Sequence, residues 1–303
     1  MDLDLILPTF NRARLLKDCL DSILRATRPA GLRITVVIVD NNSKDDTKSL
    51  VKAFIDQSAL PIRYIFVERA GKSAALNEAI AQTDAELVGL IDDDEQLDPE
   101  WFEVAYREFL GSPELDYVGG PYYPNWEQAQ PKWFPSRYGG IVGIVPRPER
   151  VAFSPEFNGM LMGGNAIIRR SVLQKVLPYP EHLGKIGKKI RSGEDEVIYH
   201  RLLEIGAKGT VVPDLIIHHW IPADRLTKSY CRRWAVGRGI SEGSQLRERG
   251  FSEPGLLGIQ RYKFGIALQG MKEMLFARSQ QERFAAQLSV LDCFATLYGR
   301  YFY

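Results

Sequence analysis

Short apolar strands alternate with amphipathic helices through residues 3–91, and this pattern constrains the fold more than any other feature of the sequence. Apolar runs at 3–7, 34–39, 63–67 and 87–91 predict strands, and the segments at 15–24, 45–57 and 71–82 predict helices between them. Regular alternation of this kind predicts a parallel sheet flanked by helices. In such sheets ligands lie outside the carboxyl ends of the strands.

The last of these strands runs directly into three carboxylates, Asp92, Asp93 and Asp94. Because side chains alternate along a strand, we expect Asp92 and Asp94 on one side and Asp93 pointing away. Two carboxylates at a strand end form a site that suits Mg²⁺ or Mn²⁺, with substrate phosphates and water as the remaining ligands. The alternative is an acidic turn that caps the helix after it.

Further polar residues follow the earlier strands, and the edge rule gathers Pro8, Thr9, Asn11, Asp40 and Lys72 beside the aspartates. Asp40 would bind a base or ribose, or cap a helix, and Lys72 would meet a phosphate at a helix start, or be solvated. The first turn lacks G-x-G-x-x-G and the chain lacks G-x-x-x-x-G-K-[ST], which disfavours dinucleotide dehydrogenases and P-loop NTPases.

Composition narrows the function classes further. The 303 residues are 45% hydrophobic and 25% charged with a formal net charge of +1, which is ordinary for a globular protein and gives no reason to expect nucleic acid as a partner. The three cysteines have no metal-ligand spacing and cannot all pair, which fits a reducing compartment. We expect neither a signal peptide nor a membrane span, because a basic n-region and an apolar run of about 18 residues are both missing.

Four motifs occur in order: P-T-F-N-R at 8–12, V-D-N-N-S-K-D at 39–45, G-K-S-A-A-L-N-E-A at 71–79 and I-D-D-D at 91–94. In order and spacing they resemble the nucleotide-binding half of family 2 glycosyltransferases of the GT-A fold, and the resemblance covers roughly residues 1–235. Leu76 stands where the family has an arginine. The resemblance implies an α/β fold with a Rossmann-like, mostly parallel sheet and flanking helices, to which the sequence adds a C-terminal helical segment.

The resemblance also implies site residues. Nucleotide contacts are implied for Pro8, Thr9, Asn11, Arg12, Asp40, Asn42, Lys72, Asn77, Asp92 and Asp93. Asp94, Asp92 and His219 would hold Mn²⁺ or Mg²⁺, with His218 in reserve. Gly164 and Asn165, in a G-G-N segment, would contact the donor sugar together with Glu194.

The acidic run Gly193-Glu194-Asp195-Glu196 precedes a helical pattern. On its own it is either a helix N-terminus favoured by the dipole or a source of a general base, which typically contributes about 10²–10⁴-fold to the rate. The resemblance implies that Asp195 is this base and that Glu194 binds sugar or acceptor hydroxyls.

Residues 111–160 are rich in glycine, proline and aromatic residues, which predicts loops over a core or an acceptor wall that includes Trp126 and Trp133. The segment 230–234 resembles in part the Q-x-x-R-W segment of processive family members, with Tyr230 in place of the glutamine. Arg232, Arg233 or Arg238 would then compensate diphosphate charge, and Gly237 and Gly239 would allow a mobile flap that also carries Trp234.

The C-terminal segment 254–303 is predicted to be helical, with an apolar stripe of Phe284, Leu288, Leu291, Phe294, Leu297 and Tyr301. This stripe either packs on the domain or on a second subunit, which would give a homodimer, or it lies on an anionic membrane.

We therefore predict three parts: 1–110, the nucleotide-binding half; 111–240, the acceptor and catalytic half; and 241–303, a helical extension. The predicted activity is that of a metal-dependent, inverting hexosyltransferase. It would move a sugar from a nucleotide-diphosphate donor, a UDP-sugar on family frequency, to a saccharide or lipid-linked saccharide hydroxyl in cell-surface or exopolysaccharide biosynthesis. The expected location is cytoplasmic, or peripheral on the cytoplasmic face of the inner membrane. A nucleotidyltransferase, a non-catalytic nucleotide-sugar-binding module and a glycoside hydrolase are the alternatives.

Overall fold

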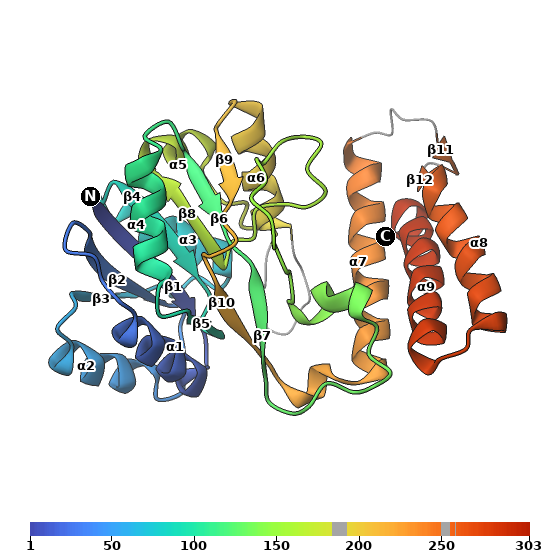
Figure 1. Ribbon diagram of the computed structural model, residues 1–303, viewed down its shortest axis with the longest axis horizontal. Helices are drawn as coiled ribbons and strands as arrows, with labels where there is room; N and C mark the ends of the chain where they lie inside the picture. Colours follow the sequence, from blue (N-terminus) through green and yellow to red (C-terminus); the bar gives the residue numbers. More distant parts are fainter. Residues whose placement is uncertain (184–192, 250–254, 258) are drawn as a thin grey trace. The chain divides into compact units, whose positions relative to one another are not determined.

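The computed structural model describes residues 1–183, 193–249, 255–257 and 259–303 (Figure 1). The chain divides into two compact units, one formed by residues 1–123 and 145–220 and the other by residues 124–144 and 221–303. We call them the sheet unit and the helical unit. These boundaries differ from those predicted after residues 110 and 240, which stay a prediction about functional halves.

The sheet unit is built on a seven-stranded sheet with the order β3-β2-β1-β4-β8-β6-β9. Its strands are β1 (Asp2–Thr9), β2 (Arg33–Asp40), β3 (Ile62–Phe66), β4 (Leu87–Ile91), β6 (Tyr117–Gly119), β8 (Asn165–Arg169) and β9 (Gly209–Val211). The first four are parallel, β8 is antiparallel to both β4 and β6, and β6 and β9 are parallel. The predicted mostly parallel α/β sheet is confirmed.

Helices cover both faces of this sheet (Figure 1). They are α1 (Ala13–Arg25), α2 (Thr47–Gln57), α3 (Lys72–Ala81), α4 (Trp101–Gly111), α5 (Arg170–Val176) and α6 (Glu194–Glu204). Successive residues of β1 enter different hydrophobic clusters: Leu5 packs in the cluster that contains Trp101, and Ile6 in the one that contains Leu76. Because both faces are buried, the strands are continuously apolar, as the sequence indicated.

The apolar run at 210–217 predicts a single strand, but this prediction is wrong, because the chain leaves one sheet for another within these residues. Residues up to Val211 belong to β9, and β10 (Ile217–Ile221) pairs with β5 (Glu95–Leu97) and β7 (Tyr122–Trp126) in a second, three-stranded sheet. Between β9 and β10, Leu215 N–H donates to Val212 O and closes a turn. This turn contains Pro213, which has no N–H to donate to a neighbouring strand. An apolar run alone does not show such a change of sheet.

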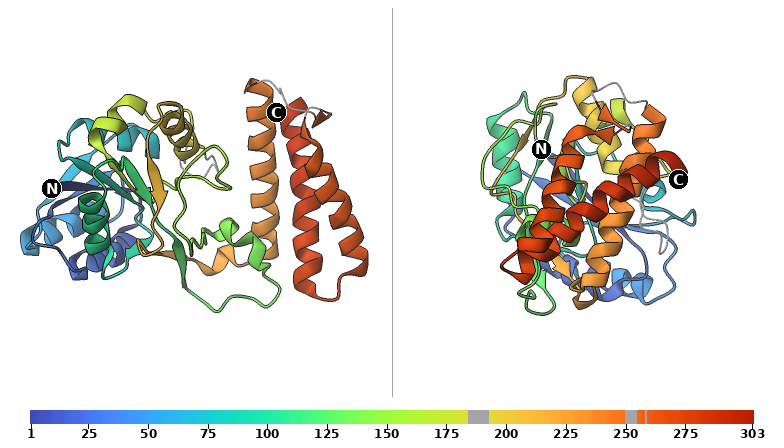
Figure 2. Two further views of the ribbon diagram at one scale, coloured as in Figure 1. Left: turned by 45° about the horizontal axis from the view of Figure 1, so that its top comes forward. Right: turned by 90° about the vertical axis from the view of Figure 1, so that its right-hand side faces the viewer.

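Long helices make up most of the described part of the helical unit (Figure 2). Its elements are η1 (Ser136–Val142), η2 (Ala223–Arg225), α7 (Lys228–Arg249), β11 (Gly255–Leu256), β12 (Ile259–Gln260), α8 (Arg261–Phe276) and α9 (Gln280–Phe302). Gly243 and Gly299 let α7 and α9 approach closely, since a Cβ at either would meet the backbone of the facing helix. Ser279 and Glu282 form a capping box at the start of α9.

A buried ionic network joins α7, α8 and α9. Lys263 is 5% exposed, and its Nζ lies 2.6 Å from Glu242 Oε2, 3.2 Å from Asp292 Oδ2 and 3.0 Å from Thr296 Oγ1. Arg238 pairs with the other oxygen of Asp292 at 2.5 Å. The segment predicted to be a mobile flap is therefore part of a continuous helix that packs against its neighbours.

The predicted C-terminal stripe is split in the structure. Phe284 and Leu288 are buried, whereas Phe294 and Tyr301 are 59% and 54% exposed. Helix α8 also exposes large apolar side chains, which we call the α8 outer face: Tyr262, Ile266, Leu268, Met271, Leu275 and Phe276. No helix in the described part of the chain has the length and apolarity that a membrane span requires.

Candidate active site

Lys72 lies among three carboxylates beyond the carboxyl ends of the strands. Gly71, with a φ of 128°, makes the turn into α3, and Lys72 is the first residue of that helix. Its Nζ lies 2.5 Å from Asp92 Oδ1. Burial lowers the pKa of Lys72, but the charges of Asp92, Asp195 and Glu194 more than offset this and raise that pKa well above its usual value. Lys72 is therefore a fixed cation at neutral pH.

Arg12 holds the other two aspartates. Its Nη1 lies 2.8 Å from Asp93 Oδ1 and 2.8 Å from Asp94 Oδ2, and Thr9 Oγ1 donates to Asp93 Oδ2 at 2.8 Å. The expectation that Asp93 points away from Asp94 is wrong, because β4 ends at Ile91 and the aspartates form a turn to which strand alternation does not apply. Burial raises the pKa of Asp93 to about 6, against the opposing charge of Arg12.

His219 approaches the same aspartates from β10. The register of β10 on β5 sets His219 opposite Glu95, and His219 Nε2 lies 3.8 Å from Asp94 Oδ2. The described residues contain no group of three or more metal-ligating side chains. A carboxylate and an imidazole still fit a divalent cation that takes its remaining ligands from phosphate and water. Arg12 donates to the same oxygen of Asp94, so a metal ion bound to that oxygen would compete with the Arg12 guanidinium for it.

Asp195 lies at the start of α6, after Gly193 has turned the chain with a φ of 119°. The residue is only half-buried, but its Oδ1 atom is shielded from solvent and has no hydrogen-bond partner among the described residues. Its Oδ2 accepts from Gly163 N–H at 3.2 Å. Burial raises the pKa of Asp195, and burial followed by the charge of Asp195 raises that of Glu194 to about 7.

Two residues that the sequence analysis did not select belong to this site, Glu95 and Tyr122. Glu95 is buried and accepts from Asp92 N–H at 2.8 Å, and burial, with the charges of Asp92 and Asp94, raises its pKa well above the usual value. The hydroxyl of Tyr122 donates to Met162 O at 3.3 Å. A fourth carboxylate directly after D-D-D was the available signal for Glu95.

Close packing explains why residues 163 and 164 are both glycine. A Cβ on Gly163 would meet the carboxylate of Asp195, and a Cβ on Gly164 would meet that of Glu95. The two glycines therefore admit two carboxyl groups to one segment of backbone.

The predicted nucleoside residues gather at the ends of β1 and β2. Asp40 is buried, with Oδ1 accepting from Ser43 N–H at 2.8 Å and Oδ2 from the Tyr64 hydroxyl at 2.6 Å. It is not a helix cap, because α2 begins at Thr47.

Asn11 and Asn42 both have a left-handed backbone, with φ values of 52° and 68°. Their side-chain oxygens accept from Lys44, through its N–H at 2.6 Å and its Nζ at 2.6 Å. Pro8 and Thr9 are buried where β1 ends. The structure thus brings these predicted residues together, and their contact with a nucleotide stays a prediction.

Two predicted asparagines have structural partners. Asn77 exchanges two hydrogen bonds with the backbone of Tyr179, at 3.0 and 2.8 Å. Asn165 is 1% exposed; its Nδ2 donates to Leu215 O at 2.7 Å and Pro121 O at 3.2 Å, and its Oδ1 accepts from Trp101 Nε1 at 2.9 Å. Its amide is fully used within the fold, and its contact with a donor sugar stays a prediction.

The remaining predicted residues lie in the helical unit. Trp126, Trp133 and Trp234 pack against one hydrophobic cluster, in which Trp133 meets Phe284 edge-on at 5.2 Å. Arg233 donates to Ser229 Oγ at 2.8 Å within α7. Their roles toward acceptor and diphosphate stay predictions, as does the reserve role of His218, whose Nε2 lies 3.9 Å from Asp98 Oδ2.

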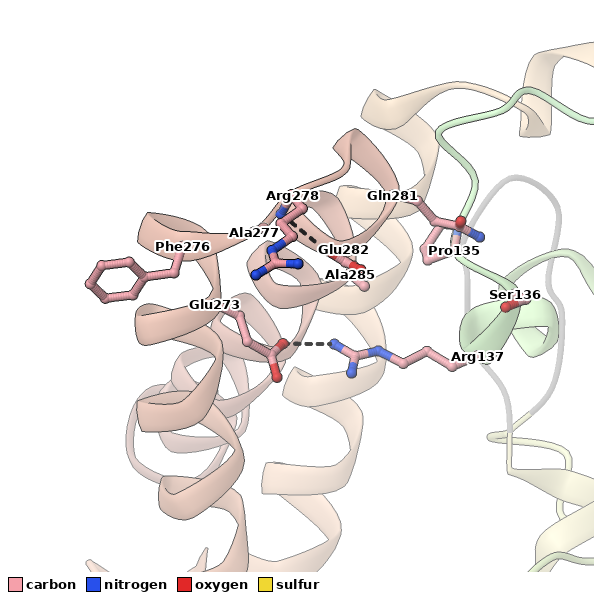
Figure 3. Close-up of a pocket in the computed structure, with 10 residues that line it drawn as sticks. All are labelled: Pro135, Ser136, Arg137, Glu273, Phe276, Ala277, Arg278, Gln281, Glu282 and Ala285. Carbon is pink, nitrogen blue, oxygen red and sulfur yellow. Dashed lines mark hydrogen bonds and ion pairs between the residues drawn. The ribbon is translucent and has the colours of Figure 1, made fainter.

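A cavity of about 560 Å³ also lies in the helical unit (Figure 3). Pro135, Ser136 and Arg137 line one side of it, and Arg137 pairs with Glu273 of α8 at 3.8 Å. None of the predicted site residues lines it. The carboxylate site described above is therefore the candidate for chemistry.

Comparison with known proteins agrees with the family resemblance of the sequence motifs. The sequence profile of the family "Glycosyl transferase family 2" matches residues 4–177. Glycosyltransferase AglE of Haloferax volcanii is 27% identical over 239 residues, which cover 77% of this chain and 71% of that protein. An N-acetylglucosaminyltransferase of Azorhizobium caulinodans is 28% identical over 225 residues, 72% of this chain and 55% of that protein. The chain thus spans only about half the length of the second relative.

Solved structures share the fold at low sequence identity. A mannosyltransferase of Pyrobaculum calidifontis, in complex with GDP-Man and Mn²⁺, aligns with a TM-score of 0.67 and 16% identity over 99% of this chain and 87% of that chain. TarS of S. aureus in complex with UDP-GlcNAc aligns with a TM-score of 0.53 and 17% identity over 99% of this chain and 91% of that chain. The α/β sheet with its strand-end carboxylates is thus of the GT-A type. Since the family profile covers more than half of the sequence, the chain belongs to glycosyl transferase family 2.

Proposed function

We propose that the protein is an inverting glycosyltransferase that moves a sugar from a nucleotide-diphosphate donor to an acceptor hydroxyl. The observation that carries this proposal is Asp195 Oδ1, a shielded carboxylate oxygen without a partner among the described residues, beside Lys72 and the aspartate turn. An unsatisfied buried acceptor costs about 1–3 kcal/mol, so such an atom is typical of a group reserved for a ligand. Family membership and the nucleotide-sugar complexes of the structural neighbours support the donor class.

The donor would lie along the strand ends, with its base near Asp40 and its diphosphate near Lys72 and Arg12. Both cations are already held in place by aspartates, so each can turn toward phosphate oxygens without a large rearrangement. Asp94, with Asp92 and His219 beside it, would hold Mn²⁺ or Mg²⁺. When bound, this cation supplies Lewis-acid stabilisation of the leaving diphosphate.

Asp195 would take the proton of the acceptor hydroxyl as that oxygen attacks the anomeric carbon. The site offers this one carboxylate with a free, shielded oxygen, so a single displacement with inversion is the proposed course. Glu194, with a pKa of about 7, would hold a proton in part of the molecules and bind a sugar hydroxyl as donor or acceptor. The nitrogen of Gly163 would keep Asp195 in place through its hydrogen bond to Oδ2.

The UDP-sugar donor, the saccharide acceptor and a role in cell-surface or exopolysaccharide assembly belong to the same proposal. UDP is proposed because TarS was solved with UDP and with UDP-GlcNAc, although GDP-Man is the donor in the mannosyltransferase complex. A nucleotidyltransferase would use the same nucleotide site, but it would release pyrophosphate instead of a nucleoside diphosphate.

The test combines binding and turnover. Calorimetric titration of UDP, GDP, dTDP and CDP, each with and without Mn²⁺, should identify one diphosphate whose binding needs the metal. Asp195→Asn should retain this binding and lose about 10²–10⁴-fold in transfer or donor hydrolysis. Asp56→Asn, at an exposed position of α2, is the control and should be unchanged. If Asp195→Asn kept most of its activity, the base assignment would be wrong.

We also propose that the α8 outer face lies on an anionic lipid surface, where a lipid-linked acceptor would be presented. The cations Arg261 and Lys272 are exposed beside these apolar side chains. Glu273 is the one carboxylate among the described residues of α8, and it is partly buried and paired with Arg137. Apolar area with only positive charge complements anionic headgroups. A second copy of the same face would bring like charges together, which disfavours a homodimer through it.

Sedimentation with vesicles tests this placement. The protein should sediment with phosphatidylglycerol-containing vesicles and much less with pure phosphatidylcholine. Leu275→Ser with Phe276→Ser should abolish binding, whereas Leu110→Ser, at an exposed leucine of the sheet unit, should not change it. A concentration-dependent dimer that the same double variant dissociates, without vesicle binding, would show that a second subunit covers the face instead.

A further inference from the structure

We propose that Arg147 receives an oxyanion, a carboxylate or a phosphate, carried by the acceptor saccharide, and so selects anionic acceptors. This inference rests on the proposed transferase function, because it assigns a ligand to the acceptor side of that site. None of the sequence motifs includes Arg147.

The backbone of Arg147 is anchored by the sheet unit on both sides. Before it, Val145 and Tyr122 exchange two backbone hydrogen bonds, at 3.0 and 3.1 Å. After it, Val211 N–H donates to Val151 O at 2.8 Å. Arg147 itself lies between two prolines, whose rings fix the φ angles on either side. A loop that is pinned in this way presents its side chain from a defined position.

The guanidinium of Arg147 is also fixed in direction. Its central carbon lies 4.7 Å from the ring centroid of Phe157, and Phe157 packs edge-on against Phe153 at 5.1 Å. The terminal nitrogens lie against Gly159, where a Cβ would come within 2.6 and 2.8 Å of them. A guanidinium stacked on an aromatic ring keeps its planar fork of donors available for a carboxylate or phosphate.

No described residue accepts from this fork. The side chain of Arg147 makes no hydrogen bond or ion pair with any described residue. Burial lowers the pKa of Arg147, so part of its hydration is lost without a protein partner. The other half-buried arginines among the described residues of the sheet unit all donate to carboxylates or carbonyls; they are Arg12, Arg169, Arg170 and Arg201. The N–H donors of Arg147 are thus fixed in position and partly desolvated, and no described residue accepts from them. Such donors are better explained by a ligand than by a structural role.

The position of Arg147 assigns the oxyanion to the acceptor. Phe157, on which Arg147 stacks, packs against Phe153, and Phe153 packs edge-on against Tyr199 of α6 with a ring-centroid distance of 5.7 Å. Tyr199 follows Asp195 by four residues on α6, so both side chains lie on one face of that helix. Val145, two residues before Arg147, pairs with Tyr122, whose hydroxyl donates to Met162 O, next to the Gly163 N–H that holds Asp195. Arg147 is therefore linked by packing and hydrogen bonds to the segments that hold the proposed base, whereas Arg12 is bound to Asp93 and Asp94 on the donor side.

Binding of simple sugars tests the inference without any turnover. Saturation-transfer NMR would measure the affinities of methyl β-D-glucuronide, glucose 6-phosphate and the neutral methyl β-D-glucoside. Arg147→Gln is the variant, and Arg150→Gln is the matched control, because Arg150 is a surface arginine paired with Glu108. Calorimetry of UDP with Mn²⁺ on the same proteins reports the donor site and the fold.

The wild type and Arg150→Gln should bind at least one anionic sugar about 10-fold to 100-fold more tightly than the neutral glycoside, the range that a charge-assisted hydrogen bond supplies. Arg147→Gln should lose this preference and keep its UDP affinity. The glucuronide and the phosphate arms decide which oxyanion is preferred. Equal binding of neutral and anionic sugars by the wild type would overturn the inference, and so would weaker UDP binding by Arg147→Gln, which would place Arg147 on the diphosphate. Failure of the wild type to bind any nucleoside diphosphate would instead refute the proposed function.

Discussion

Replacing Asn165 by leucine separates a structural role from a sugar contact. Leucine has the same number and branching of heavy atoms as asparagine, so the change removes the amide without leaving a cavity, although the two methyl groups need more room. It deprives Trp101 Nε1–H and Leu215 O of their hydrogen-bond partner, whereas Pro121 O keeps the N–H of Ile217 as a second donor. Two buried groups left unsatisfied cost about 1–3 kcal/mol each, so we expect a loss of about 2–6 kcal/mol in the free energy of unfolding.

Chemical denaturation with unchanged m-value would measure this loss. Asn158→Leu is the control, because Asn158 is exposed and the expected change there is within about 0.5 kcal/mol. If Asn165→Leu left stability unchanged within about 0.5 kcal/mol but raised the KM for the donor, the structural account of Asn165 would be refuted and its role as a sugar contact supported.

Two further perturbations test the carboxylate cluster. Glu194→Gln should flatten the dependence of stability on pH. The folded state raises the pKa of Glu194 from 4.5 to about 7, so it binds this proton more tightly than the unfolded chain does. The free energy of unfolding of the wild type should therefore fall by up to about 3 kcal/mol as the pH rises through that window. Denaturation at pH 5 and pH 8 measures it with Glu196→Gln as control, and equal slopes in wild type and Glu194→Gln would contradict the reasoning. Gly164→Ala should lower the free energy of unfolding by about 1–3 kcal/mol, because the new methyl group meets the carboxylate of Glu95. This loss of stability should be smaller in a Glu95→Ala background, and a loss of the same size there would show that Glu95 is not the cause.

The sequence by itself determined the alternating elements and the edge where the site lies. Short continuous apolar runs and the 3.6-residue period are local properties, and they identified β1 to β4 and α1 to α3 close to their observed bounds. The rule that ligands bind at the carboxyl ends of parallel strands then selected Asp40, Lys72 and the aspartates from local order alone. The motif resemblance added Asp195, which no periodicity indicates.

The tertiary structure decided how these residues are used, because partners far apart in the chain set that use. Asp93 lies against Arg12 instead of pointing away from Asp94, since β4 ends at Ile91, before the aspartates, and Arg12 comes from the turn between β1 and α1. Asn165 became the junction of three chain segments, and the apolar run at 210–217 was divided between two sheets. Arg147 shows the same limit: its lack of a protein partner is a property of everything packed around it, which a sequence does not state.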